Sequence, residues 1–121
     1  MKELRESGED YLEKILQLEE SNGIVRSVDI ANALGVSKPS VSRAMGVLKD
    51  AGYIEQEIYG DISLTASGRA KAEEIYGRHK MIKQFFSEVL GVGPVIADED
   101  ACRVEHVLSQ ETLAAIRKYM K

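Results

Sequence analysis

Six side chains of the kinds that bind metal ions are spread over three separate parts of the sequence. They are Asp10, Glu13, His79, Cys102, Glu105 and His106. On a helix the positions i, i+3 and i+4 share one face, so a thiol, a carboxylate and an imidazole near the end of the chain would point the same way. Asp10 and Glu13 repeat the i, i+3 spacing. A cation that gathered these groups would connect the beginning of the chain to its end.

The donor types narrow the choice of metal. Carboxylates suit Mn(II) and Fe(II), imidazole suits most first-row divalent ions, and a thiolate shifts the preference towards Fe(II), Co(II), Ni(II) or Zn(II). The set could hold one ion, or two ions that share a bridging carboxylate.

Each of these residues also has a simpler interpretation. Asp10 and Glu13 could be exposed charges, His79 could pair with a neighbouring acid, and Cys102 could be a small core residue. A helical Cys-x-x-Glu-His is uncommon, however, and its presence favours a metal site.

Length and composition set the outer limits of the fold. A chain of 121 residues with 44% hydrophobic residues fits one domain or two small modules with a packed interior. Abundant helix-forming residues and only two prolines predict a mostly α-helical protein. The charged N-terminus and the absence of an apolar run of about 18 residues predict a cytoplasmic protein that makes no membrane contact.

Charge is distributed unevenly along the chain. The net charge of −4 and the pI of about 5.2 argue against a protein that binds nucleic acid over its whole surface. Residues 37–49 nevertheless contain Lys38, Arg43 and Lys49 and no acid. This segment is therefore locally basic within an acidic chain.

That basic segment lies in a predicted helix-turn-helix. A first helix follows Ser7 and stops at residues 21–23, and Ser27 is the expected N-cap of a short helix that ends at Gly35. Ser37 is the expected N-cap of the next helix. A tight turn containing Gly between two short helices is typical of this motif, and its second helix reads DNA.

The segment that follows predicts the wing of a winged helix-turn-helix. Residues 53–58 and 62–64 have strand character, and the three residues between them include a glycine, which indicates a β-hairpin. We therefore expect residues 1–70 to form a winged helix-turn-helix DNA-binding domain.

The remaining sequence predicts helices only. Thr65 can cap a long helix that runs to Gly91, and Ser109 can cap the last helix. Between them, Asp98 or Asp100 is expected to begin a helix that carries the Cys-Glu-His face. Residues 71–121 are therefore expected to form an all-helical domain for dimerisation and metal binding.

Eight residues around the predicted reader helix are candidate DNA contacts. They are Arg26, Ser37, Lys38, Pro39, Ser40, Ser42, Arg43 and Tyr59. Serine hydroxyls and basic side chains contact phosphates or base edges, and the proline offers apolar surface to a thymine methyl group. Taken singly, Ser37 could be only a cap, Arg43 a solvated charge and Tyr59 a packing residue. Their occurrence together, in the order of a winged helix-turn-helix, favours double-stranded DNA as the partner.

The order of these motifs resembles the diphtheria-toxin-repressor family of metal-dependent transcriptional repressors. The resemblance covers essentially the whole chain and is carried by the predicted wing, Arg78-His79 and the sequence Glu-Asp-Ala-Cys-Arg-Val-Glu-His-Val-Leu-Ser over residues 99–109. It implies a homodimer whose first half binds operator DNA. It also implies control of metal-homeostasis genes through Mn(II) or Fe(II), with Co(II), Ni(II) or Zn(II) binding in vitro, and no organic cofactor.

The same resemblance implies that all six metal-preferring residues are ligands. Asp10 resembles the manganese-responsive branch of that family, whereas Cys102 resembles the iron-responsive branch. Lys83 and Asp98 stand where the iron-responsive branch has glutamate and histidine ligands. By this resemblance, the chain combines features of both branches.

Two other functions are consistent with part of the sequence. One is a winged-helix regulator that is not gated by metal, in which Glu105 and His106 merely pair. The other is a metalloenzyme that uses Glu105 or Glu13 as a base. No glycine loop or nucleophile motif accompanies the ligands, so we expect a protein that is not an enzyme.

An apolar set including Phe85, Phe86, Leu108, Leu113 and Ile116 could form a dimer interface or a core.

Overall fold

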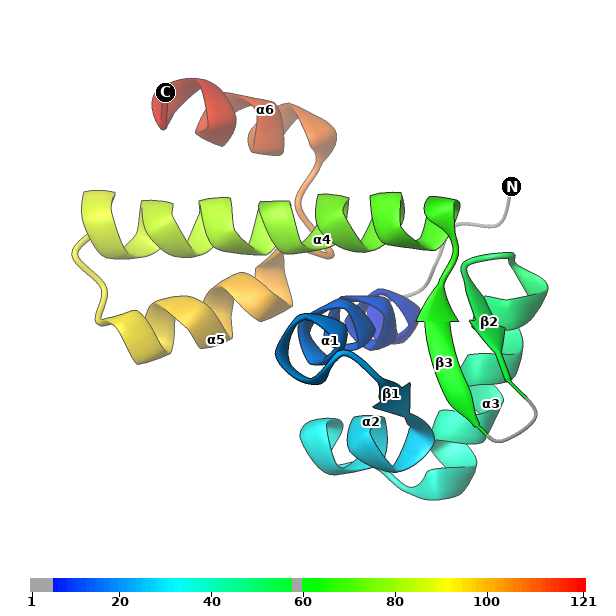
Figure 1. The fold of residues 1–121 in the computed structure, drawn as a ribbon. Helices are drawn as coiled ribbons and strands as arrows, with labels where there is room; N and C mark the ends of the chain where they lie inside the picture. The colour runs from blue at the N-terminus through cyan, green and yellow to red at the C-terminus, as the bar shows by residue number, and fades with distance from the viewer. Residues whose placement is uncertain (1–5, 58–59) are drawn as a thin grey trace. The chain divides into compact units, whose positions relative to one another are not determined.

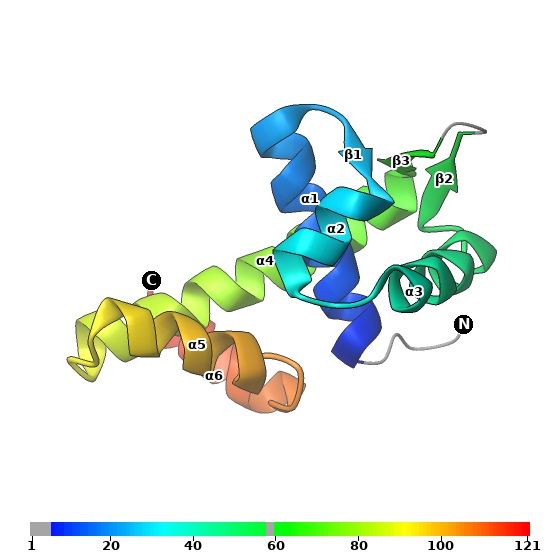
Figure 2. The same ribbon diagram turned by 90° about the horizontal axis from the view of Figure 1, so that it is seen from below.

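The computed structural model describes residues 6–57 and 60–121 and consists mainly of helices (Figures 1 and 2). The chain divides into two compact units, Met1–Glu73 and Glu74–Lys121. No helix in the described residues is long and apolar enough to cross a membrane. The prediction of a mostly α-helical fold is confirmed.

Three helices form most of the first unit. They are α1 (Glu6–Asn22), α2 (Ser27–Leu34) and α3 (Lys38–Asp50). One face of each helix is apolar, and these faces supply a common core whose fully buried members include Leu12, Ile15, Ile30, Val41 and Leu48. The predicted helix-turn-helix is therefore present as α2 and α3.

The turn between α2 and α3 has the expected signals at both ends. Gly35 ends α2 with a left-handed backbone (φ 66°), which glycine adopts without steric cost. The Ser37 hydroxyl oxygen accepts a hydrogen bond of 3.2 Å from the Ser40 N–H and so caps α3. The predicted cap at Ser27 is wrong by one residue. Arg26 precedes α2, and its backbone N–H donates to the Asp29 carboxylate at 3.0 Å, so the acidic side chain performs the capping.

A small antiparallel sheet completes the first unit. Its strands β1 (Val25–Arg26), β2 (Ile54–Gln56) and β3 (Asp61–Leu64) lie in the order β1-β3-β2. Ile54 pairs with Leu64 in the predicted hairpin, and Val25 pairs with Ile62. The pairing of the two predicted hairpin strands is confirmed, with β3 beginning at Asp61, which was expected in the connection, and with Ile58 and Tyr59 outside the described residues. The strand β1 was not expected from the sequence, because two residues are too few to show an alternating pattern.

The second unit is made of helices. They are the second part of α4 (Ala66–Gln84), the π-helical segment η1 (Phe85–Val89), α5 (Pro94–Val104) and α6 (Gln110–Tyr119). Ile82, Ala101 and Leu113 form the buried centre, one from each of α4, α5 and α6. Phe86 and Leu108 pack against this centre. Of the apolar residues considered for a dimer interface, Leu113, Phe86 and Leu108 thus contribute to the core of this unit.

Two helices, α4 and α6, begin at the predicted N-caps. The Thr65 hydroxyl accepts from the Gly68 N–H at 3.0 Å at the start of α4. The Ser109 hydroxyl accepts from the Thr112 N–H at 3.1 Å at the start of α6. Both are N-caps of the type that these side chains favour.

The expected helix for the Cys-Glu-His face differs from the structure at both ends. It begins at Pro94 rather than Asp98 or Asp100, because proline has a suitable φ for a first turn and no N–H that needs a partner. It ends at Val104, whose carbonyl accepts from the N–H groups of Val107 and Leu108. Cys102 is therefore on the helix, Glu105 is its C-terminal cap residue, and His106 lies in the turn that follows.

Candidate nucleic-acid interface and metal centre

The reader helix α3 has one buried and one exposed face. Val41, Met45 and Leu48 point into the core, whereas Ser42 and Arg43 are exposed. Lys38 is exposed at the first position of the helix. No acidic residue lies in the first turn, and the helix N-terminus carries a partial positive charge. The exposed face is thus suited to a negatively charged backbone.

The other predicted DNA contacts have more than one task. The Ser37 hydroxyl is 2.9 Å from the Ser40 hydroxyl as well as capping α3, so both serines already have local partners. Arg26 is exposed, but its Nε donates to the Asp61 carboxylate at 3.2 Å. Pro39 is exposed in the first turn of α3. Tyr59 lies outside the described residues.

The first unit contributes two carboxylates to the metal candidates. Asp10 and Glu13 lie one turn apart on α1 and therefore on the same face. Asp10 is half-buried and Glu13 is 5% exposed. Glu13 is therefore not an ordinary solvated charge. Buried carboxylates are expensive unless a cation or hydrogen bonds compensate for them.

The second unit contributes a closely spaced carboxylate and imidazole. Glu105 Oε1 lies 3.3 Å from His106 Nε2, and both side chains are almost completely buried. Glu105 remains in helical register with α5, because its N–H donates to the Ala101 carbonyl at 3.1 Å. The turn after α5 therefore holds a carboxylate oxygen and an imidazole nitrogen, two possible metal ligands, close together.

His79 on α4 belongs to a second polar group in the same unit. Its Nε2 lies 2.8 Å from Asp98 Oδ1 on α5, and the Lys83 ammonium lies 3.6 Å from the same oxygen. The hydrogen bond from His79 holds the pKa of Asp98 below its ordinary value, with further contributions from the Lys83 ammonium and from the His79 ring when it is protonated, although desolvation opposes the shift. His79 therefore does pair with an acid, and this acid is Asp98.

Cys102 completes the predicted set. It forms no disulfide, is half-buried on α5 and lies three residues before Glu105. The described residues thus include buried or half-buried carboxylates, imidazoles and a thiol, which are donor types that first-row divalent ions accept. The chemistry of these residues fits such an ion.

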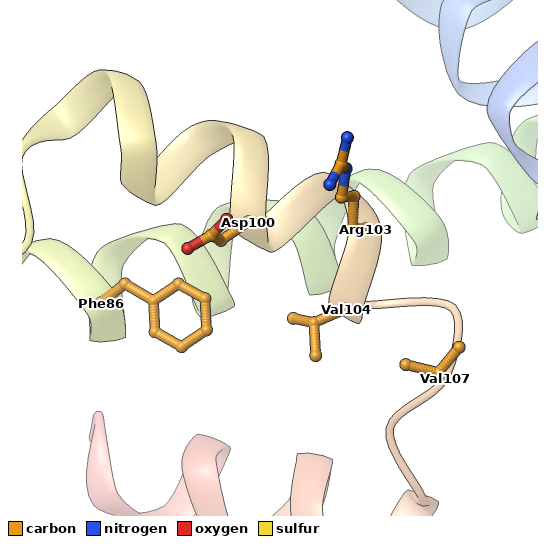
Figure 3. A pocket seen from close by; sticks show the side chains of 5 residues that line it. All are labelled: Phe86, Asp100, Arg103, Val104 and Val107. Carbon is orange, nitrogen blue, oxygen red and sulfur yellow. The ribbon is translucent and has the colours of Figure 1, made fainter.

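An apolar hollow of about 400 Å³ lies on another part of the second unit. Phe86, Val104 and Val107 line it together with the charged Asp100 and Arg103 (Figure 3). In Figure 3 the aromatic ring of Phe86 and the two valines lie on one side of α5, whereas Arg103 extends away from them. Its polar members, Asp100 and Arg103, provide no pair of metal-ligand side chains, so this hollow differs in kind from the metal candidates.

The fold and these side chains define a winged helix-turn-helix protein whose helical second unit carries side chains of the types that bind metal ions. Comparison with known families agrees with both halves. Residues 3–62 match the N-terminal DNA binding domain of the iron dependent repressors. Residues 65–121 match the metal binding and dimerisation domain of the same proteins.

Two relatives cover almost the whole chain. An uncharacterized HTH-type transcriptional regulator of Methanocaldococcus jannaschii is 36% identical over 119 residues, which are 98% of this chain and 95% of that protein. The transcriptional regulator MntR of Escherichia coli is 42% identical over 115 residues, which are 95% of this chain and 74% of that protein.

Solved structures show the same fold. IdeR of T. acidophilum is 26% identical with a TM-score of 0.83, covering 99% of this chain and 55% of that one. A manganese-dependent transcriptional repressor in complex with manganese is 28% identical with a TM-score of 0.86, covering 93% of this chain and 52% of that one. The chain thus spans about half the length of these solved structures.

The chain belongs to the iron dependent repressor family, which is the diphtheria-toxin-repressor family of metal-dependent transcriptional regulators. The resemblance drawn from the sequence is confirmed. This family consists of transcriptional regulators rather than enzymes.

Proposed function

We propose that this chain represses metal-homeostasis genes by binding operator DNA as a homodimer when Mn(II) or Fe(II) is bound. Residues 1–70 bind the DNA, and residues 71–121 dimerise and bind the metal. The observation that carries the proposal is the buried pair of Glu105 and His106, which combines a carboxylate with an imidazole in a chain whose α3 exposes a basic face.

We assign the metal to Asp10, Glu13, His79, Cys102, Glu105 and His106. Carboxylate oxygens and imidazole nitrogens are donors that Mn(II) and Fe(II) both accept, and Cys102 adds a softer donor that favours Fe(II), Co(II), Ni(II) or Zn(II). The burial of Glu13 and Glu105 supports this assignment, because a carboxylate away from water gains most from a nearby cation.

The two units contribute different parts of this set. Asp10 and Glu13 come from the DNA-binding unit, and the other four residues come from the helical unit. A bound divalent cation supplies the positive charge that offsets the mutual repulsion of these acidic groups. Without it, the carboxylates disfavour a close approach of α1 to the helical unit. With those charges compensated, one arrangement of the two reader helices is favoured in the dimer.

The size of such an effect can be bounded from general coupling energies. A coupling of about 1 to 3 kcal/mol changes DNA affinity about 5- to 150-fold. A gain of that size would separate metal-dependent binding to operator DNA from the non-specific DNA binding that persists without metal.

The helix α3 would then contact the major groove through Ser37, Lys38, Pro39, Ser40, Ser42 and Arg43. Arg26 and Tyr59 would contact the DNA backbone beside it.

Dimerisation requires an apolar surface beyond the core of the helical unit. Leu90, Val95 and Ile96 are each more than half exposed and lie close together in sequence around the start of α5. Because contiguous exposed apolar patches are typical of protein interfaces, we place the dimer interface at these residues. Two-fold symmetry would place two copies of α3 about one helical turn of DNA apart.

The decisive experiment measures DNA binding as a function of metal. Purified protein is stripped of metal and titrated anaerobically with Mn(II) or Fe(II), while fluorescence anisotropy follows a labelled DNA duplex taken from the promoter region of its own gene. We expect a 5- to 150-fold gain in affinity on metal addition. DNA affinity that does not respond to either ion would identify a winged-helix regulator that is not gated by metal.

A pair of carboxylate variants provides the control. Glu105→Gln removes a buried charge with almost no change in volume, whereas Glu111→Gln removes an exposed carboxylate on α6. The first variant should lose the metal response and keep salt-dependent, non-specific binding, and the second should behave like the wild type. A normal metal response in Glu105→Gln would remove Glu105 from the proposed ligands.

A further inference from the structure

We propose that Asp98 is a positioning residue for the metal centre, because it fixes the tautomer and orientation of the His79 ring. This inference rests on the proposed function, in which His79 is a ligand. Asp98 itself does not touch the ion in this proposal. It acts through the 2.8 Å hydrogen bond between its Oδ1 and His79 Nε2.

The direction of this hydrogen bond determines which ring nitrogen can bind metal. An ionised carboxylate only accepts hydrogen bonds, so Nε2 must carry the proton. A neutral imidazole has one protonated and one unprotonated nitrogen, and therefore the lone pair of His79 is on Nδ1. Asp98 thus selects Nδ1 as the metal-binding atom.

The orientation of the ring is restricted by two contacts. Asp98 holds one edge, and Tyr76 packs against the ring in an edge-to-face arrangement with centroids 6.5 Å apart and an interplanar angle of 74°. His79 is only 8% exposed, which leaves little room for another rotamer. A ligand that is oriented before metal arrives loses less conformational entropy on binding.

Lys83 has a supporting role in this arrangement. Its ammonium lies 3.6 Å from the same Asp98 oxygen that accepts from His79. His79 and Lys83 are one turn apart on α4, so a single helix presents a donor and a counter-charge to one carboxylate on α5. The positive charge of Lys83 favours the ionised, accepting form of Asp98.

The tautomer can be measured without metal. The sequence contains only two histidines, so selective ¹⁵N labelling of histidine gives two imidazole spin systems, and His79→Gln assigns them. Spectra of the metal-free protein are recorded at about pH 8, above the ordinary imidazole pKa. We expect His79 Nε2 to have a protonated, pyrrole-type shift and Nδ1 to have a pyridine-type shift. An Nδ1–H tautomer in the wild type would overturn the proposal.

Three variants separate positioning from other roles of Asp98. Asp98→Ala should give a mixture of His79 tautomers and lower Mn(II) affinity about 10- to 100-fold, the usual range for loss of such a supporting group. Asp98→Glu keeps a carboxylate, which only accepts hydrogen bonds when ionised, and should restore the tautomer and most of the affinity. Asp100→Ala, an exposed acid on the same helix, should change neither measurement.

Other results would contradict the proposal in distinguishable ways. An unchanged tautomer together with unchanged Mn(II) affinity in Asp98→Ala would show that Asp98 does not position His79. Equal loss of affinity in Asp98→Glu and Asp98→Ala, with the tautomer preserved in the first, would make Asp98 a direct ligand instead. Wild-type protein with the expected tautomer but no Mn(II) or Fe(II) binding would overturn the proposed function and the role of Asp98 with it.

Discussion

Gly68, in the first turn of α4, packs directly against the backbone of Tyr53. A Cβ atom added at residue 68 would lie 1.8 Å from the Tyr53 carbonyl oxygen. The same oxygen accepts a 3.0 Å hydrogen bond from the Thr65 N–H, and the Thr65 hydroxyl donates to the Gly52 carbonyl at 2.7 Å. The start of α4 is thus attached to the beginning of the wing, and this attachment requires a residue without a side chain.

The first prediction concerns this contact. Gly68→Ala should lower the free energy of unfolding by about 1 to 3 kcal/mol, because the backbone must move to admit the methyl group. The helix propensity of alanine acts in the opposite direction but is worth only about 1 kcal/mol. Urea denaturation followed by circular dichroism provides the measurement.

Gly46→Ala is the matched control, since Gly46 is also helical and in the same unit, and no atom lies within 4 Å of its added Cβ. That variant should be neutral or stabilised by about 0.5 to 1 kcal/mol. Equal stability of the two variants would show that the approach of Tyr53 to Gly68 imposes no constraint.

The second prediction separates the two tasks of Ser37. Ser37→Ala should cost about 1 kcal/mol through loss of the α3 cap, and Ser37→Asp should keep that stability because aspartate is also a good N-cap. If Ser37 also faces a phosphate, the new negative charge should weaken DNA binding in the aspartate variant. Thermal unfolding and anisotropy on the same samples measure both effects.

The cap of α6 offers a comparison for Ser37. Ser109→Ala removes an equivalent hydrogen bond in the helical unit and should cost a similar amount of stability. The DNA affinity of the Ser109→Ala variant, measured with saturating metal, should equal that of the wild type. Normal DNA binding by Ser37→Asp would limit Ser37 to its structural role.

The third prediction concerns the basic face of α3. Arg43→Ala should weaken DNA binding and, if Arg43 contacts a phosphate, reduce the slope of log affinity against log salt by about one. Lys118→Ala removes an exposed positive charge from α6 and serves as the control. A salt slope that is unchanged in Arg43→Ala, with relaxed sequence preference, would indicate a base contact instead.

The fourth prediction addresses the metal preference. If Cys102 is a ligand, titration with Co(II) should produce a thiolate-to-metal absorption band in the wild type and none in Cys102→Ser. Cys102→Glu should shift competition towards Mn(II) relative to Co(II) and Zn(II), since it replaces a soft donor with a hard one. The absence of the thiolate band in the wild type would assign the half-buried Cys102 to packing.

The helices of this protein were predictable because their signals are local. Ser37, Thr65 and Ser109 each cap the helix that the sequence indicated, and the apolar spacing located the core faces. The helix α5 was placed too late, because Asp98 and Asp100 resemble capping residues while Pro94 already starts the helix. In the sequence alone, a proline in a loop between two helices looks the same as a proline in the first turn of a helix.

The side chains around the metal candidates were predictable only in kind. The types of Glu105 and His106 indicated metal binding, but their position beyond the end of α5 follows from the hydrogen bonds made by Val104. The contact between His79 and Asp98 depends on how α4 packs against α5, and 19 residues separate the two in the sequence. Long-range packing of this kind has no local signature in the sequence.

The pairing of β1 with β3 has a consequence for how signals pass through the DNA-binding unit. Val25 and Arg26 immediately precede α2, and their partners Ile62 and Asp61 lie in the wing, so the hairpin is fastened to the entrance of the helix-turn-helix. The ion pair between the Arg26 and Asp61 side chains is a second contact between these two segments. A displacement of α2 would therefore be transmitted to the hairpin through β1, because the same two residues begin the helix-turn-helix and pair with the wing strand β3.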